Sequence, residues 1–232
     1  MTIQLYDLAT ADPGLRFSPY CWRVKMALAH KGLVWQEIPW HFTEKDRLPN
    51  PNAGTVPVLV DDGETVSDSW KIAEYLDERY PQNPLFDSAQ ARSEALLIKF
   101  WIERTIHPFI SRMGVGDFLS TLHEKDKAYF RQSREKRIGM PIEQFMQDRD
   151  QTREGFRTAL EPLRAMLVEQ PYVAGNNPGY ADYIVFGILQ WMRCGSPYAS
   201  LQRDDAVFDY RERLLDLYDG FARNAQYREV SS

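Results

Sequence analysis

The stretch TVPVLVDDGETVSDSWKIAEYLDERY, residues 55–80, carries the clearest structural pattern in this 232-residue chain. The run VPVLV (56–60) is typical of a buried strand, and DDG (61–63) is typical of a hairpin turn. The segment ETVS (64–67) then predicts a strand that pairs back on the first. From Ser69 to Tyr80 apolar residues recur with helical spacing, and a proline follows. The stretch therefore predicts a ββ hairpin followed by a helix.

The residues before this hairpin predict a βαβ unit. Ile3 to Leu8 alternates between apolar and polar side chains, as a half-buried strand does. Ser18-Pro19 opens a helical pattern that ends at Lys31-Gly32, which fits the preference for proline at a helix start and glycine just past its end. Leu33 to Pro39 predicts a second strand. The predicted order of the first half is therefore βαβ-ββα.

The second half of the chain shows no strand signal from about Ala91 onward. Residues 114–144 are polar and charged, and they predict only short helical patches. Longer helical patterns are predicted at residues 91–110, 145–167, 181–194 and 204–221. The 181–194 segment is apolar nearly all round, so we expect it at the centre of a helical domain.

The change of pattern predicts two domains. Residues 1–82 form the α/β part and residues 90–232 the all-α part, with a proline-containing linker at residues 81–87. The predicted fold class is therefore α/β plus all-α.

Composition narrows the functional class. The net charge of -5 argues against a nucleic-acid partner, which usually requires a basic surface. No apolar run approaches the roughly 20 residues of a membrane span, and MTIQLYDLAT (1–10) lacks the pattern of a signal peptide. We therefore expect a cytoplasmic protein without a membrane association.

The cysteine and histidine content argues against disulfide bonds and a structural metal site. The chain has two cysteines, Cys21 and Cys194, too few for a disulfide framework or a cysteine-rich zinc site. Its four histidines never occur at i, i+4 spacing. We therefore expect no structural metal.

Four motifs together resemble the cytosolic glutathione S-transferase family. FSPYCWRVK (17–25) matches the family's thiol-activating position, TVPVL (55–59) its Val-Pro strand, and SDS (67–69) its acidic-residue-Ser pair. Residues 175–182 resemble the capping motif of its central helix, although Gly179 stands where the family usually has Ser or Thr. The resemblance covers the full chain. It implies a thioredoxin-like N-terminal domain, a C-terminal helical bundle that contributes the acceptor pocket, and glutathione as co-substrate.

The physical chemistry of Ser18 agrees with this resemblance. A residue at the N-cap of a helix lies beside unpaired N–H groups and the positive end of the helix dipole, which favour an anion. A hydroxyl group there can donate a hydrogen bond to a thiolate. Lowering a thiol pKa by about 2 units requires about 2.7 kcal/mol, which one charge-assisted hydrogen bond plus the dipole can supply. Ser18 is therefore the expected catalytic residue, and simple helix capping is the alternative.

The resemblance implies further contacts with glutathione. Pro57 would be cis, and Val56 would offer its backbone N–H and C=O to the cysteinyl part. Asp68 and Ser69 would bind the γ-glutamyl end. A sheet-edge proline and a simple helix cap are the alternatives for these two motifs. The glycyl carboxylate would be bound by His41 or Lys45, for which a solvated surface position is the alternative.

Ser18 and Cys21 form an S-x-x-C motif at the start of the predicted helix. Thioredoxin-like oxidoreductases use C-x-x-C, in which the first cysteine attacks, so a dithiol reaction is excluded here. We expect Cys21 to be a small buried residue.

Other conspicuous side chains receive less specific interpretations. The basic cluster Arg131, Arg134, Lys136 and Arg137 is expected to be solvated, with steering of an anionic substrate as the alternative. Most of a set of six aromatic residues should lie in the core and a few should line the acceptor pocket: Tyr20, Trp22, Trp101, Phe109, Phe118 and Trp191.

Within the family, the chain most resembles bacterial β-aryl-etherases and related fungal enzymes. This likeness rests on the long first loop, on DSW (68–70) followed by IAEYLD (72–77), and on FRQSRE (130–135). It implies attack of glutathione on a hydrophobic aromatic electrophile, with cleavage of a β-aryl ether. WRV (22–24) also resembles maleylacetoacetate isomerases, so a glutathione-dependent isomerase is an alternative. A non-catalytic binder of hydrophobic ligands is another.

An apolar helix predicts the assembly. Residues 96–102 carry more apolar side chains than one intramolecular face needs: Leu96, Leu97, Ile98, Phe100, Trp101 and Ile102. Because exposed apolar stripes usually form interfaces, we expect a symmetric homodimer with this helix near the axis.

Overall fold

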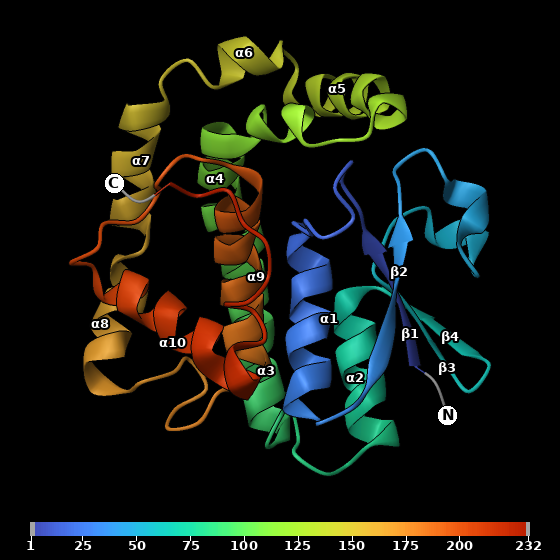
Figure 1. The fold of residues 1–232 in the computed structure, drawn as a ribbon. Coiled ribbons are helices and arrows are strands. Elements are labelled where there is room, and N and C mark those ends of the chain that lie inside the picture. Colours follow the sequence, from blue (N-terminus) through green and yellow to red (C-terminus); the bar gives the residue numbers. More distant parts are fainter. Residues whose placement is uncertain (1–2, 231–232) are drawn as a thin grey trace.

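The computed structural model describes residues 3–230. Its first half contains a four-stranded sheet with the order β2-β1-β3-β4 (Figure 1). Strand β1 pairs in parallel with β2 and antiparallel with β3, and β3 pairs antiparallel with β4. The strands are β1 (Ile3–Leu8), β2 (Trp35–Trp40), β3 (Val58–Asp61) and β4 (Glu64–Ser67).

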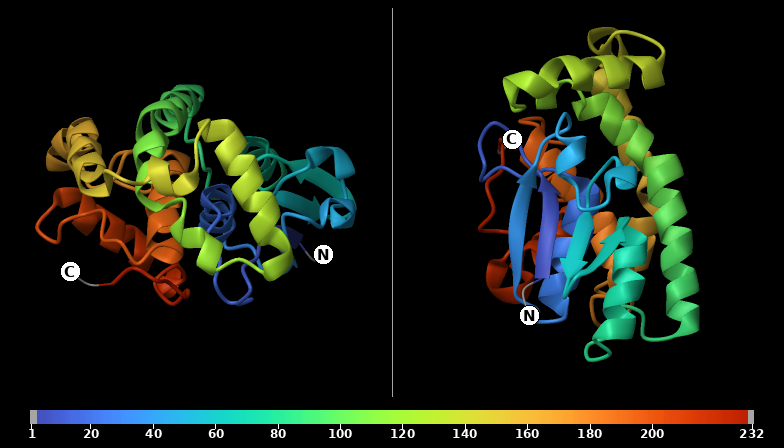
Figure 2. Two further views of the ribbon diagram at one scale, coloured as in Figure 1. Left: turned by 90° about the horizontal axis from the view of Figure 1, so that it is seen from above. Right: turned by 90° about the vertical axis from the view of Figure 1, so that its right-hand side faces the viewer.

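Two helices cover one face of this sheet and separate it from the helical half (Figures 1 and 2). Helix α1 (Pro19–His30) begins at the N-cap Ser18, and helix α2 (Ser69–Arg79) begins at the N-cap Asp68. Two short 3-10 helices, η1 (Lys45–Arg47) and η2 (Pro51–Ala53), lie between β2 and β3. The predicted βαβ-ββα order is confirmed.

Up to residue 230, the regular secondary structure of the second half is helical, apart from one isolated bridge between Tyr172 and Gly175. Its long helices are α3 (Ala89–Trp101), α4 (His107–Gly114), α5 (Glu124–Ile138), α7 (Arg149–Ala159), α8 (Glu161–Glu169), α9 (Tyr180–Gly195) and α10 (Ala206–Gly220). Shorter elements are the π-type turn η3 (Ile102–Ile106), the 3-10 helix η4 (Asp117–Ser120) and α6 (Ile142–Phe145). The predicted fold class, a thioredoxin-like α/β half followed by an all-α half, is confirmed.

Helix α9 lies at the centre of the helical half, as predicted, and every one of its residues is buried. It packs against α1, so it joins the two halves of the molecule. Gly187 lies at this contact, where a Cβ atom would collide with the backbone carbonyl oxygen of Pro19. Asp182 accepts a hydrogen bond from the backbone N–H of Gly179 at 3.0 Å, which is the half of the reciprocal capping box that a glycine N-cap retains.

Two sequence predictions need correction. The segment 114–144, expected to hold only short helical patches, contains the 15-residue helix α5. The helix expected over 91–110 begins at Ala89 and continues through the π-type turn into α4. The prediction missed α5 because its sequence is polar. Only Asp126 and Phe130 of this helix are buried, so its sequence shows little hydrophobic periodicity. None of the helices in residues 3–230 has the length and hydrophobicity that crossing a bilayer requires.

Candidate functional site

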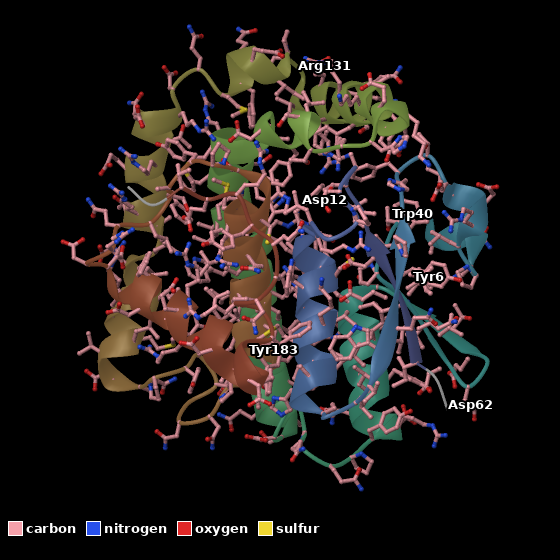
Figure 3. All side chains as sticks on the ribbon, in the orientation of Figure 1. Tyr6, Asp12, Trp40, Asp62, Arg131 and Tyr183 are labelled. Atoms are coloured by element: carbon pink, nitrogen blue, oxygen red, sulfur yellow. The ribbon has the colours of Figure 1, made fainter. Side chains whose placement is uncertain are left out.

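A cavity of about 380 Å³ lies where the N-terminal end of α1 faces α4, α5 and α9. Figure 1 shows α5 crossing above the ends of α1 and β2, and Figure 3 places Trp40 below that helix. The α/β half lines it with Leu8, Phe17, Ser18, Pro19, Tyr20, Trp40, Phe42, Gly54, Thr55 and Val56. The helical half lines it with His107, Ser111, Val115, Tyr129, Phe130, Ser133, Arg134, Arg137, Ile138 and Trp191. Both halves therefore contribute to one site.

Ser18 is positioned by the first turn of α1. Its Oγ accepts a hydrogen bond from the backbone N–H of Cys21 at 3.3 Å, as an N-cap residue does. The residue is only 4% exposed, yet it forms part of the cavity wall. Because the hydroxyl oxygen accepts from the helix, its proton is available to a group inside the cavity. Ser18 therefore caps α1, as the capping interpretation predicts, and this does not prevent its hydroxyl from donating a hydrogen bond to a group in the cavity.

A buried group of charges supports the loop before Ser18. Asp7 on β1 lies 3.0 Å from the Lys25 ammonium and 3.7 Å from the Arg16 guanidinium, and Glu37 lies 3.6 Å from Arg16. Burial alone lowers the pKa of Lys25, but Asp7 and Glu37 raise it above its ordinary value. Arg16 also offers its backbone carbonyl to the Trp22 indole N–H at 2.9 Å. These contacts join β1, β2 and α1 behind the cavity.

The Val56-Pro57 peptide bond is cis. Val56 lines the cavity next to Gly54 and Thr55, whereas Pro57 is buried behind it and forms no part of the lining. The structure thus brings Ser18 and Val56, two residues singled out from the sequence, to the same cavity.

Asp68 and Ser69 lie at the N-terminal end of α2, outside the lining of this cavity. Asp68 is exposed, and its carboxylate accepts hydrogen bonds from the N–H groups of Trp70 at 2.9 Å and Lys71 at 3.2 Å. The predicted helix cap is therefore present. Burial raises the pKa of Tyr20, and the Asp68 charge adds to this effect, so Asp68 acts electrostatically on a residue of the cavity wall.

His41 and Lys45 lie beside α5 and do not line the cavity. The His41 ring is 3.2 Å from the buried carboxylate of Asp126, and burial lowers the pKa of His41. The Lys45 ammonium lies 5.2 Å from the ring centre of Tyr129, which does line the cavity. Both residues therefore lie next to the cavity wall, Lys45 over the ring of Tyr129 and His41 between Trp40 and Phe42 in the chain.

Cys21 is completely buried within the first turns of α1 and does not line the cavity. Burial raises the pKa of the Cys21 thiol well above its ordinary value, and the Asp7 carboxylate raises it further. A thiol in these surroundings is a poor nucleophile because only the thiolate attacks.

Sequence reasoning did not assign most of the wall that the helical half supplies. Of the six aromatic residues considered, Tyr20 and Trp191 line the cavity, and the buried Phe118 stacks on Trp191 with ring centres 4.3 Å apart. His107 also lines it, and burial, followed by the charges of nearby arginines, lowers its pKa to about 4. Helix α5 could have been recognised from its ends, because acidic residues open it, basic residues close it, and Gly139 adopts the left-handed conformation just past its end.

The comparisons with known proteins agree with this architecture. Residues 13–84 match the model for the glutathione S-transferase N-terminal domain, and residues 95–205 match the model for its C-terminal domain. The glutathione S-transferase-like protein ustS of Aspergillus flavus is 31% identical over 227 residues, covering 82% of this chain and 79% of that protein. Glutathione S-transferase U7 of Arabidopsis thaliana is 25% identical over 182 residues, covering 77% of this chain and 68% of that protein.

A solved structure shares the fold. The glutathione S-transferase CsGST63524 of Ceriporiopsis subvermispora, in complex with glutathione, superposes with a TM-score of 0.81 at 22% identity, covering 95% of this chain and 98% of that one. Together with the two domain matches and the 31% identity to the Aspergillus flavus protein, this places the chain in the glutathione S-transferase family.

Proposed function

We propose that this protein activates glutathione as a thiolate and transfers it to a hydrophobic aromatic electrophile. The observation that carries the proposal is the position of Ser18, whose hydroxyl caps α1 and lies in the wall of a cavity built by both halves. The positive end of the α1 dipole and a hydroxyl donor both favour an anionic sulfur at this place.

We propose the other contacts with glutathione from the family's pattern, which the position of Val56 in the cavity wall supports. Val56 in the cavity wall offers its backbone to the cysteinyl part, and Pro57 holds that segment in place. The N-terminal end of α2, with Asp68 and Ser69, binds the γ-glutamyl end. The candidates for binding the glycyl carboxylate are Lys45, whose ammonium lies over Tyr129 of the cavity wall, and His41.

For the acceptor we propose a β-aryl ether that carries a ketone. The thiolate sulfur attacks the carbon that bears the aryloxy group, so a C–S bond forms and the C–O bond breaks. The electron pair leaves on the phenolate oxygen, which takes a proton from solvent. The cavity contributes proximity and an apolar wall of Phe17, Trp40 and Trp191.

A panel of acceptors tests the reaction class. The protein is incubated with glutathione and, in turn, a β-aryl-ether ketone, a chloronitroarene, maleylacetone or a mixed disulfide. We expect the first two to form thioethers with consumption of one glutathione per acceptor. Isomerisation of maleylacetone alone, without loss of glutathione, would instead assign the isomerase activity. Turnover of the disulfide alone would assign thiol transfer, and binding without any turnover would assign a ligand carrier.

A further inference from the structure

Two arginines on α5 line the cavity without a carboxylate partner. Arg131, which lies on the outer side of the helix (Figure 3), is paired with Glu135 at 3.0 Å and Glu143 at 2.8 Å. In residues 3–230, by contrast, neither Arg134 nor Arg137 forms an ion pair with a carboxylate. Among the described residues, the helix therefore neutralises Arg131 and leaves two arginines that line the cavity, the half-buried Arg134 and the exposed Arg137, without an ion pair.

Arg134 is held in a definite position. Its guanidinium lies 4.3 Å from the ring centre of Phe130 and 5.1 Å from that of Phe42, and it donates a hydrogen bond to Ser133 Oγ at 3.0 Å. Burial, and next the charge of Arg137, lower the pKa of Arg134 to about 10, so the group stays protonated at neutral pH. Arg134 is half-buried, and a cation that is partly removed from solvent without a counter-ion is unfavourable, so an anion bound beside it reduces that cost.

The positive charge extends toward the helical side of the cavity. After burial, Arg137 is the largest influence that lowers the pKa of His107 on α4, and Arg134 contributes as well. Arg137 also opposes the rise in the pKa of Tyr20, which follows Ser18 in the chain by two residues. Both guanidinium groups therefore act on His107, a wall residue from α4, in the same cavity that Ser18 lines.

We propose that Arg134 and Arg137 bind a carboxylate of the acceptor, so that the preferred substrates are aromatic electrophiles bearing a carboxylate group. The planar guanidinium matches a carboxylate with two parallel hydrogen bonds, and the rings of Phe42 and Phe130 provide an apolar surface for the aromatic part. This inference rests on the proposed transferase function. The glycyl carboxylate of glutathione has the same chemistry, so the experiment must distinguish the two sources.

The first measurement compares two electrophiles of nearly equal shape, 4-chloro-3-nitrobenzoate and 4-chloro-3-nitrobenzamide, with glutathione at saturation. We expect the wild-type protein to prefer the carboxylate in kcat/KM after correction for the uncatalysed rates. Arg134→Gln should lower kcat/KM for the carboxylate about 10- to 100-fold and leave the amide within about threefold, the range of a charge-assisted bidentate contact.

Three further variants control for structure. Arg137→Gln changes an exposed residue and should also reduce the preference for the carboxylate. Arg134→Lys keeps the charge and should retain more of the preference than Arg134→Gln. Arg131→Gln removes the outward arginine of the same helix and should leave the preference unchanged. Equal losses for both electrophiles in the Arg134 and Arg137 variants would overturn the inference and leave the transferase function intact.

A binding measurement separates the two proposals. Quenching of tryptophan fluorescence by 4-nitrobenzoate and 4-nitrobenzamide, with S-methylglutathione present, reports binding through Trp40 and Trp191 in the cavity wall. In one outcome, the wild type binds 4-nitrobenzoate more tightly than 4-nitrobenzamide and this difference is lost in Arg134→Gln, while neither chloronitro electrophile is turned over. This outcome would contradict the transferase proposal and support the anion site. If Arg134→Gln and Arg137→Gln bind S-methylglutathione more weakly than the wild type but bind 4-nitrobenzoate equally well, the arginines bind the glycyl carboxylate. That result would overturn the inference.

Discussion

Ser18 satisfies two requirements with one hydroxyl group. Its oxygen accepts from the Cys21 N–H and so caps α1, while its proton can be donated to a sulfur atom in the cavity. The two interpretations of Ser18 that the sequence leaves open therefore do not compete. A residue that stabilises the helix also places its hydroxyl where the helix dipole favours an anion.

We expect Ser18→Ala to separate these functions. Loss of the cap should cost about 1 kcal/mol of folding stability. The pKa of bound glutathione should rise because a donor to the thiolate is lost, and turnover at neutral pH should fall roughly 10- to 1000-fold. Raising the pH should restore part of the rate. The measurement is a pH–rate profile of both proteins with a chloronitroarene, alongside the KM for glutathione, which should change little.

Cys21→Ser is the matched control for this experiment. Because the Cys21 thiol is buried and its pKa is raised, the substitution should leave the pH–rate profile nearly unchanged. An inactive Cys21→Ser protein together with an unaltered Ser18→Ala profile would show that the chemistry runs through the cysteine.

His107 gives a prediction for the pH dependence of stability. Its pKa is about 4 in the folded protein, because of burial and then of Arg137, Arg23 and Arg134, against about 6.5 in an unfolded chain. Between these values the unfolded state binds more protons, so stability falls as the pH drops through this window. At pH 5 this amounts to roughly 2 kcal/mol. Urea unfolding of wild type and His107→Gln at pH 7 and pH 5 should show a smaller loss in the variant, in which only other groups such as His30 and His41 titrate, and equal losses in both would contradict the prediction.

At the scale of elements, local sequence patterns account for much of the α/β half. The DDG turn at 61–63 and the Ser-Pro start at 18–19 fix where elements begin and end through short-range chemistry. Helix α5 lacks an apolar stripe, because it covers a cavity and only Phe130 and Asp126 among its residues are buried. Hydrophobic periodicity therefore predicts α9, which is buried on all sides, and misses α5.

Local sequence patterns also explain which residues of the site could be predicted from the sequence. Ser18 and Val56 lie in motifs with a local signature, and both were identified. Arg134 and Arg131 are three residues apart on one helix, and sequence alone gives no indication that one lines a cavity while the other pairs with Glu143 outside it. That difference depends on where α5 lies over the α/β half, which is a tertiary contact.

The contact between α9 and α1 leads to a prediction at this scale. A Cβ atom at Gly187 would collide with the Pro19 carbonyl oxygen and lie 3.1 Å from Arg23 Cγ, so Gly187→Ala should displace the first turn of α1. We expect a loss of about 1–3 kcal/mol in stability. We also expect slower turnover, since Ser18 moves with that turn.

Gly155→Ala on α7 is the control, because its Cβ would meet the Phe109 side chain away from the cavity. Thermal unfolding and chloronitroarene turnover measure both effects. Wild-type stability and turnover in Gly187→Ala would show that the interface can absorb a methyl group.

At the scale of the whole molecule, the site exists because two differently built halves meet. The α/β half supplies the end of a helix and a strand-edge backbone, and the helical half supplies arginine and aromatic side chains. The first set combines backbone features with the side chains of Phe17, Trp40 and Phe42, whereas the second set consists mainly of side chains from three helices, α4, α5 and α9. On the proposed function, we therefore expect acceptor preference to depend mainly on the wall residues of α4, α5 and α9, with Ser18 kept in place.

One surface of the molecule remains unexplained by its own fold. On α3, Ala95 is buried against the protein, as is Ile102 at the start of η3, while Leu97 is 71% exposed and Phe100 is 46% exposed. We expect this face to lie in a symmetric homodimer, because burying such apolar side chains is favourable and a two-fold axis makes the patch self-complementary. Light scattering at micromolar concentration should give twice the chain mass of 27.1 kDa.

Substitution tests whether α3 forms that interface. Leu97→Glu combined with Phe100→Glu places two like charges on each side of the proposed axis, so the mass should fall to that of one chain. Val168→Glu on α8 changes an apolar residue that is 79% exposed on a different helix, and it should leave the mass unchanged. A single-chain mass for the wild-type protein would contradict the dimer. A dimer that persists in the double variant and dissociates in Val168→Glu would instead move the interface from α3 to α8.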